Sequence, residues 1–408
     1  MPVDWQRLFA ERAERMRVSD IREILKVTAQ PDVISLAGGL PAPELFPIDE
    51  YRRAFEWVLE TDGAHALQYG PSEGYAPLRA WLAERLSRSG IRCAADDVLI
   101  TNGSQQALDL IGKIFLDPGD AVLCERPTYL GALQAFNQYE ATYVVVPMDD
   151  DGMDVEAVER ELARDAAGPR RIKLIYALPN FQNPTGRSMS GPRRPRLVEL
   201  AARFGVPIVE DDPYGELRYE GEPLPSLKSL DRDGLVIYLG TFSKILAPGF
   251  RLGWVVASPD ALEGILHAKQ PADLHTGVAP QIATYYVARD GFVDQHVEHI
   301  KAFYRERRDV MLRALEEHFP PSARFTRPAG GLFVWAELPA HIDTRQLLLD
   351  AVHEKVAFVP GQGFHPDQSG TNTMRLNFSN VAPDLLREGI RRLGLAIQRA
   401  TVEREVRI

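Results

Sequence analysis

One stretch of the sequence, Gly240-Thr241-Phe242-Ser243-Lys244-Ile245-Leu246-Ala247-Pro248-Gly249-Phe250-Arg251, decides how the rest of the chain is interpreted. The apolar run 235–239 leads into it and predicts a strand that ends there. Lys244 stands among small and hydroxyl side chains, with no carboxylate within several positions to pair with it. Thr241 and Ser243 offer hydroxyl groups, and Arg251 offers a planar guanidinium group. Hydroxyls together with an arginine suit a phosphate.

A lysine beside a bound phosphate ester is the arrangement that a Schiff base with pyridoxal 5'-phosphate (PLP) requires. The alternative is a lysine in a strand-to-loop connection that has no role. This stretch alone leaves both interpretations open, so the other motifs of the chain have to decide between them.

Composition limits the classes of protein that need to be considered. The chain has 408 residues, more than one ordinary domain, and its 45% hydrophobic and 25% charged residues are typical of a globular protein. The net charge of −10 and the dispersed basic residues argue against nucleic acid as a partner. Cys93 and Cys124 form no disulfide framework and no metal-ligand spacing, so we expect buried thiols and no metal. Without a signal peptide or a membrane span, we expect a cytoplasmic protein.

The order of predicted elements indicates the fold class. Strand and helix patterns alternate from about residue 96 to 257, which predicts an α/β fold with a mostly parallel sheet and helices on both faces. Helices are predicted near the N-terminus over 4–17 and 21–29, at 259–269, and over 281–317 with a break near Gly291. Strands at 331–338, 357–360 and 373–379 beside helices at 347–353 and 385–398 predict a second, α+β unit.

Polar residues follow several predicted strands, where ligands of open α/β sheets bind. Asp211 could face the pyridine nitrogen of PLP and keep the ring protonated, although two consecutive acids are more often surface charges. Asn183, held extended by Pro184, and Tyr214 could donate to the phenolic oxygen of the cofactor. Tyr129 could stack on the ring.

A strand-to-helix turn, Asn102-Gly103-Ser104, has the general geometry of a phosphate site, because the free N–H groups of a helix N-terminus point at the anion. Arg375 is a charged residue in an apolar, alternating strand; it could hold the α-carboxylate of an amino acid or be a surface arginine on an edge strand. The phosphate cup is expected to combine Ser104, Gln105, Thr241, Ser243 and Arg251.

These motifs, in this order, make the chain resemble the class I/II aminotransferases of PLP fold type I over nearly its whole length. Within that family it is most similar to the 2-aminoadipate aminotransferases of lysine biosynthesis and their kynurenine aminotransferase relatives. The first likeness rests on Gly103-Ser104-Gln105-Gln106, Asn183-Pro184-Thr185-Gly186, Asp211-Asp212-Pro213-Tyr214, Ser243-Lys244 with Arg251, and Arg375. The second rests on the segments 35–47, 67–70, 181–186 and 272–276.

The resemblance implies a seven-stranded sheet sandwiched by helices in a large PLP domain (46–280), and a smaller α+β domain built from both chain ends (281–408, with an N-terminal arm and lid helix over 1–45). It implies a homodimer in which Tyr69 reaches the phosphate of the partner's cofactor. The backbone of Gly39 would lie near the substrate carboxylate, alongside Asn183 and Arg375. Arg22, on the lid helix, would meet a distal carboxylate; its alternative is a solvated helix charge.

The expected reaction is a ping-pong transamination of an L-amino acid of the 2-aminoadipate, glutamate, leucine or aromatic type, with 2-oxoglutarate as the amino acceptor. Lys244 would remove and return the α-proton, assisted by Asp211 and Tyr214. One alternative is another PLP reaction on this fold, a β-lyase or decarboxylase. A second is a PLP-sensing transcription regulator, but such chains carry a winged-helix domain of roughly 60–80 residues, and about thirty residues precede Val33 here.

Overall fold

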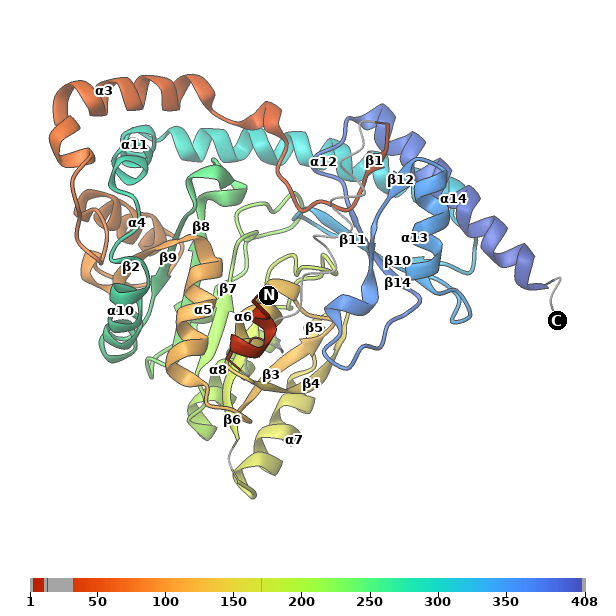
Figure 1. The fold of residues 1–408 in the computed structure, drawn as a ribbon, viewed down its shortest axis with the longest axis horizontal. Coiled ribbons are helices and arrows are strands. Elements are labelled where there is room, and N and C mark those ends of the chain that lie inside the picture. The colour runs from red at the N-terminus through yellow and green to blue at the C-terminus, as the bar shows by residue number, and fades with distance from the viewer. Residues whose placement is uncertain (1–2, 11–12, 14–31, 170, 406–408) are drawn as a thin grey trace.

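The computed structural model describes residues 3–10, 13, 32–169 and 171–405. Its centre is an eight-stranded sheet with the strand order β2-β9-β8-β7-β6-β3-β4-β5 (Figure 1). In chain order these strands are β2 (Val98–Asn102), β3 (Ala121–Arg126), β4 (Thr142–Asp149), β5 (Gly152–Met153), β6 (Ile172–Ala177), β7 (Ile208–Asp211), β8 (Val236–Thr241) and β9 (Leu252–Val256).

The sheet is mostly parallel, as predicted. Strands β8, β7, β6, β3 and β4 run parallel to one another, whereas β9 runs antiparallel to both β8 and β2. The seven expected strands are extended by β5, a two-residue strand that folds back antiparallel on β4. The C-terminal ends of the parallel strands therefore share one edge of the sheet, where ligands of such sheets bind.

Both faces of the sheet are covered by helices because successive residues of the central strands, which point to opposite faces, are apolar. In β3, Val122 and Cys124 pack with α5, α6 and α10, while Ala121 and Leu123 face the opposite side and pack with α7 and α8. The helices of this part are α3 (Ile48–Ala66), α4 (Ala76–Arg88), α5 (Gly103–Phe115), α6 (Leu130–Asn137), α7 (Val155–Ala166), α8 (Arg193–Phe204), α9 (Leu227–Leu230), α10 (Pro259–Asp273) and α11 (Val278–Ala288).

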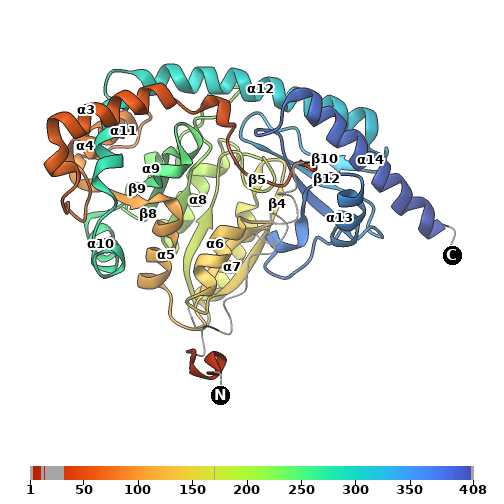
Figure 2. The same cartoon turned by 45° about the horizontal axis from the view of Figure 1, so that its top comes forward.

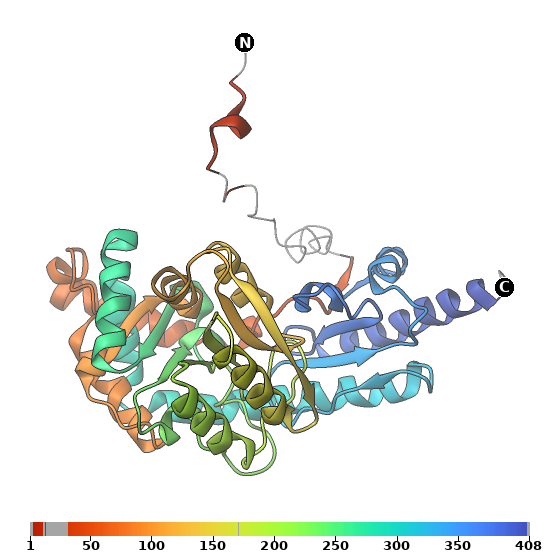
Figure 3. The ribbon, with the colours of Figure 1, turned by 90° about the horizontal axis from the view of Figure 1, so that it is seen from below.

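The C-terminal part carries a second, antiparallel sheet in the order β10-β11-β14-β13. Its neighbour is a parallel pair of β1 and β12, which brings the N-terminal residues 34–35 onto the C-terminal part. Figure 2 shows α12 running along the molecule from α11 toward α14, and Figure 3 shows the blue C-terminal part at one end. The elements are β1 (Ile34–Ser35), α12 (Phe292–His318), β10 (Arg324–Phe325), β11 (Phe333–Glu337), α13 (Thr344–His353), β12 (Val356–Ala357), β13 (Val359–Pro360), β14 (Thr373–Asn377) and α14 (Pro383–Glu405).

The helix predictions hold in part. The break near Gly291 separates α11 from α12, with Gly291 at φ 81°. The helix predicted to end near Lys269 continues to Asp273 with Pro271 inside it, because the Lys269–Asp273 ion pair (2.7 Å) and the Leu274 N–H, which donates to the Gln270 carbonyl (3.0 Å), hold the last turn. The sequence patterns did not predict α3.

Two predictions near the chain start are tested only partly. Of the helix predicted over 4–17, the described residues show a short 3-10 turn, Trp5–Leu8; the helix predicted over 21–29 lies outside the described residues. The predicted domain boundary at 280 falls inside α11, and the division itself stays a prediction.

In the described part of the chain, no helix has the length and apolar character that crossing a membrane requires.

Candidate active site

Lys244 lies directly after β8, at the end of a short turn, Phe242–Lys244. The backbone N–H of Ser243 donates to Thr241 Oγ1 at 3.1 Å and closes this turn. Lys244 Nζ donates to the Gly39 carbonyl at 3.1 Å, which brings these two predicted residues together. Burial, aided by the positive charges of nearby arginines, lowers the pKa of Lys244 to about 8. An amine with such a pKa is available as a base near neutral pH.

Asp211 ends β7 and is 2% exposed, so the alternative of a surface charge is wrong for it. Tyr176 Oη donates to its Oδ2 at 2.8 Å. Its Oδ1 is buried without a hydrogen-bond partner among the described residues. Burial raises the pKa of Asp211 to about 7. A buried carboxylate oxygen left in this way is open to a donor from a ligand.

Asp212, the next residue, has a different environment. It accepts hydrogen bonds from Asn180 Nδ2 at 3.0 Å and from Tyr238 Oη at 3.3 Å. Both of its oxygens therefore have protein partners, so the structure distinguishes the two consecutive acids.

Arg375 lies on β14, between β11 and β13, and is 4% exposed; the edge-strand alternative is therefore wrong. Its Nη1 donates to Asn183 Oδ1 at 3.0 Å and its Nη2 donates to the Ala37 carbonyl at 2.7 Å. Asn183 Nδ2 in turn donates to Tyr214 Oη at 3.5 Å. Three predicted residues from both sheets thus form one chain of contacts.

Two aromatic rings sandwich the Arg375 guanidinium group. Its Cζ lies 4.4 Å from the centre of the Phe333 ring and 5.2 Å from that of Phe364. Burial lowers the pKa of Arg375 to about 10, so the group keeps its charge at neutral pH. Its Nε is buried without a partner in the described part of the chain. A desolvated guanidinium with an unused donor is suited to a carboxylate ligand.

Ser104, Gln105 and Arg251, which are predicted to bind the phosphate, lie where β2 passes into α5. Gly103 adopts φ +72°, and a Cβ there would lie 2.4 Å from Arg251 Nη2. A Cβ on Gly253 in β9 would lie 2.7 Å from the backbone nitrogen of Ser104. The two glycines therefore let Arg251 and β9 approach the first turn of α5 closely. Gln105 uses its Nε2 to bind the Gly131 carbonyl at 2.8 Å.

The two remaining tyrosines lie in different environments. Tyr129 caps the start of α6, and its pKa is raised to about 12 by burial and by Asp211. Tyr69 is 77% exposed, and its ring meets the His275 ring edge-on at 5.8 Å. Arg22 lies outside the described residues.

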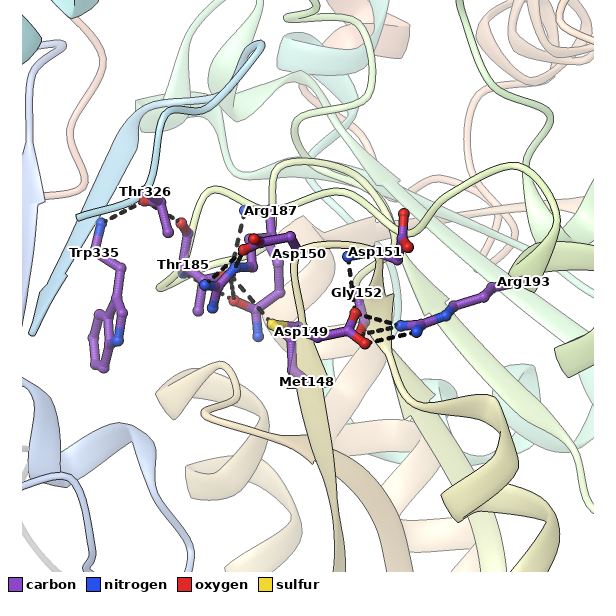
Figure 4. Close-up of polar contacts among 11 residues, drawn as sticks. Met148, Asp149, Asp150, Asp151, Gly152, Thr185, Arg187, Arg193, Thr326 and Trp335 are labelled. Atoms are coloured by element: carbon purple, nitrogen blue, oxygen red, sulfur yellow. Dashed lines mark hydrogen bonds and ion pairs between the residues drawn. The ribbon is translucent and has the colours of Figure 1, made fainter. Parts of the chain in front are cut away.

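The turn that carries Thr185 is hydrogen-bonded to the C-terminal sheet through Thr326 (Figure 4). Thr326 Oγ1 donates to the Thr185 carbonyl at 2.8 Å and accepts the Trp335 N–H at 3.0 Å. Gly186 adopts φ +70°, and a Cβ there would lie 2.5 Å from the Phe333 carbonyl oxygen. The glycine that ends the Asn-Pro-Thr-Gly motif is therefore required by the close approach of the second sheet.

Comparisons with known proteins agree with this geometry. The family model described as "Aminotransferase class I and II" matches residues 31–393. The chain belongs to the class I and II aminotransferases. It is 49% identical to aromatic-amino-acid aminotransferase 1 of Thermococcus litoralis, over 97% of this chain and 95% of that protein. It is 45% identical to 2-aminoadipate transaminase of Thermus thermophilus, over 97% of this chain and 98% of that protein.

The solved structures show the same fold. A crystal structure of Pyrococcus horikoshii kynurenine aminotransferase, in complex with PMP, kynurenine and its product, superposes with a TM-score of 0.94 at 47% identity, covering 97% of this chain and 98% of that one. The predicted PLP fold type I, with a smaller α+β part from both chain ends, is confirmed.

Aminotransferases of this family use PLP, and the residues of this chain fit that cofactor. The Asp211 oxygen without a partner suits a protonated ring nitrogen. The space that a Cβ on Gly103 would fill, beside Arg251 and the first turn of α5, suits a phosphate. Lys244 offers a partly buried primary amine on the same edge of the sheet. Three independent features therefore match the ring, the phosphate and the aldehyde of one molecule.

Sequence reasoning missed several side chains that shape this aminotransferase site. Tyr176 lies on a predicted strand, where a buried aromatic residue is ordinary, so no pattern singled it out. Phe333, on the strand predicted over 331–338, was missed for the same reason, and Phe364 lies in a short 3-10 helix, Gly361–Phe364, for which no pattern was found. In the structure Phe333 pairs with Asn377 of β14, two residues from Arg375, and the sequence patterns did not predict this register.

Proposed function

We propose that this aminotransferase moves the amino group of an L-amino acid of the 2-aminoadipate, glutamate, leucine or aromatic type to a 2-oxo acid, 2-oxoglutarate first of all, in a ping-pong reaction. The observation that carries the proposal is Arg375, which is desolvated, bonded to Asn183 and left with a free Nε. The names of the relatives support the range of side chains, because they include an aromatic-amino-acid aminotransferase and a 2-aminoadipate transaminase.

Each residue then has a defined task. PLP, when bound, supplies a carbonyl carbon for the amino group and an electron sink for the α-carbon. Lys244 binds the cofactor, and its free Nζ removes the α-proton and returns it. The Asp211 carboxylate stabilises a positive charge on the ring nitrogen. Asn183 and Tyr214 donate to the phenolic oxygen, and Tyr129 supplies the stacking ring.

The remaining residues hold the ends of the ligands. Ser104, Gln105, Thr241, Ser243 and Arg251 bind the phosphate, with the N–H groups of the first turn of α5. Arg375 binds the α-carboxylate of the amino acid, with Asn183 and the Gly39 backbone beside it. Arg22 meets a distal carboxylate when the substrate has one.

The proposed assembly is a homodimer in which Tyr69 reaches the phosphate of the partner's cofactor. The exposed side chains around α3 support this assembly: Leu67 is 78% exposed, Tyr69 77%, Ile48 68% and Leu59 54%. Large apolar side chains left exposed on and just after α3 are typical of a surface that another protein covers. The cytoplasmic location stays a prediction from the sequence.

A panel of amino donors tests the reaction. Purified protein is incubated with 2-oxoglutarate and, in turn, 2-aminoadipate, leucine, phenylalanine or kynurenine, and the new 2-oxo acid is measured. Glutamate is tested with a different 2-oxo acid as acceptor, because its reaction with 2-oxoglutarate regenerates the same two compounds. We expect turnover that depends on both substrates, with parallel lines in double-reciprocal plots. Without added oxo acid, formation of more than one equivalent of 2-oxo acid per enzyme site would contradict the proposal and indicate a β-lyase, and release of CO2 with an amine would indicate a decarboxylase.

A further inference from the structure

We propose that Asp273 is a positioning residue that fixes the first turn of α5 and, through it, the phosphate cup of the cofactor. Asp273 is the last residue of α10 and contacts three side chains. Lys269 Nζ donates to both of its oxygens at 2.7 Å. Its Oδ2 also accepts hydrogen bonds from Asn102 Nδ2 at 2.5 Å and from Gln106 Nε2 at 2.7 Å.

The two amide partners flank the cup. Asn102 ends β2 and immediately precedes Gly103, while Gln106 lies in the first turn of α5. Gln106 Oε1 also accepts the backbone N–H of Asn102 at 2.8 Å. The Asn102 carbonyl faces Arg251 Nη2 at 3.5 Å. Asp273, Asn102 and Gln106 therefore close a ring of hydrogen bonds around the strand-to-helix turn.

The charge balance of this cluster fits a positioning role. A lone carboxylate behind the cup would repel a phosphate group, but Lys269, whose side chain is 0% exposed, neutralises it. The pair thus adds no net charge beside the anion. Asp273 orients the side chains of Asn102 and Gln106. These side chains hold the first turn of α5 in place, and its free N–H groups bind an anion only when that turn is held in place.

The competing explanation is that the pair only stabilises the fold. The chain offers a matched control for it, the ion pair of Lys228 Nζ with Asp231 Oδ2 at 3.0 Å, whose side chains are 11% and 2% exposed. Asp231 also accepts the backbone N–H of Val236 at 2.9 Å. Val236 begins β8, whereas the cup lies at the other end of that strand. Both pairs are local and largely shielded from solvent, but only the Lys269–Asp273 pair contacts Asn102 and Gln106.

The test measures how fast the purified full-length holoenzyme releases PLP after dilution, by assaying the PLP that stays with the protein at intervals. No substrate is present, so the result is independent of whether the proposed reaction or its amino donor is right, although the inference rests on the PLP site proposed above. Asp273→Asn and Gln106→Leu should each speed release roughly tenfold or more, the effect expected when a charge-assisted hydrogen bond is lost.

Two further variants separate positioning from stability. The double variant Lys269→Met/Asp273→Leu replaces the buried pair by apolar residues, a change that often leaves stability intact, and it should still release PLP roughly tenfold faster because Asn102 and Gln106 lose their anchor. Asp231→Asn should lower the melting temperature yet change release by less than about threefold. The proposal is overturned if Gln106→Leu and the double variant release PLP at the wild-type rate, or if Asp231→Asn speeds release as much as they do.

Discussion

Tyr176 Oη donates a hydrogen bond to Asp211 Oδ2 at 2.8 Å, between the neighbouring strands β6 and β7. This contact uses one oxygen of the carboxylate and leaves Oδ1 without a partner among the described residues. Burial raises the pKa of Asp211 to about 7, and the Tyr176 hydrogen bond acts in the opposite direction by stabilising the charged form. Tyr176 therefore helps to keep Asp211 ionised at the pH at which it has to act.

Tyr176→Phe removes this hydrogen bond and keeps the ring. The carboxyl group should then hold its proton to a higher pH, so the acid limb of the kcat profile should move to higher pH and kcat near neutrality should fall roughly 10-fold or more. The measurement is kcat against pH for both proteins. Tyr143→Phe, at a tyrosine that bonds the Leu133 carbonyl, is the control. An unchanged pH profile would exclude the role proposed for Tyr176.

The sequence predicted the charged residues at or after predicted strands, but not the residues whose role depends on a neighbouring element. Asp211 and Lys244 could be placed together because both follow strands of a predicted parallel sheet, whose C-terminal ends share an edge. Arg375 could be found because a charge in an apolar strand is rare. Tyr176 could not be found, because its role comes from a hydrogen bond to Asp211 on the neighbouring strand, and the sequence does not predict which residues of two strands lie side by side. Asp273 was missed because Pro271 predicted that the helix had already ended.

Lys244 should carry the cofactor covalently. The purified protein should be yellow, and borohydride should attach the cofactor to Lys244, which peptide mass spectrometry would locate. Lys244→Ala should still bind PLP through the phosphate cup but lose turnover by several orders of magnitude, because it loses both the attachment point and the proton-transferring amine. A colourless protein, or attachment at Lys228 or Lys269 instead, would contradict the assignment.

The two consecutive acids should respond differently to the same substitution. Asp211→Asn removes the charge beside the ring nitrogen with little change of shape, and a lost charge-assisted hydrogen bond costs about 1.5–3 kcal/mol, so turnover should fall strongly while PLP stays attached to Lys244. Asp212→Asn should leave turnover closer to wild type and act mainly on stability, since both Asp212 oxygens bind protein groups. The measurement is the steady-state kcat of both variants, compared with wild type. The reverse order of effects would mean that the register of the site is off by one residue.

Glu125 should make the stability of the protein depend on pH. Its side chain is 2% exposed, its Oε1 has no partner in the described part of the chain, and burial raises its pKa to about 8. Between the unfolded value, 4.5, and this folded value, folding takes up a proton, so stability falls as pH rises, by of the order of 1 kcal/mol per pH unit. Glu125→Gln removes this contribution of Glu125 to the pH dependence of stability.

The melting temperature of Glu125→Gln, compared with wild type, should therefore rise progressively from pH 5 to pH 8, each pH being measured with both proteins side by side. Exposed Glu222→Gln serves as a control for the loss of one negative charge. A difference between Glu125→Gln and wild type that stays constant over this range would show that Glu125 does not titrate there in the folded protein.

The last prediction separates the two arginines assigned to the substrate. Arg375 contacts Asn183 and is buried beside Phe333, so it should serve the α-carboxylate that every amino acid carries. Arg375→Lys removes the planar, two-pronged donor geometry while keeping the charge. It should lower kcat/KM for 2-aminoadipate, glutamate, leucine and phenylalanine alike, roughly 10-fold or more.

Arg22 should act only on substrates with a second carboxylate. A charge-assisted contact worth about 1.5–3 kcal/mol corresponds to roughly 10- to 150-fold in kcat/KM. Arg22→Ala should therefore lower kcat/KM for 2-aminoadipate and glutamate by about that factor, and change the values for leucine and phenylalanine by less than about threefold. An equal loss for all four substrates would make Arg22 a structural or dimer-contact residue. No loss for any of them would assign it to a solvated helix face.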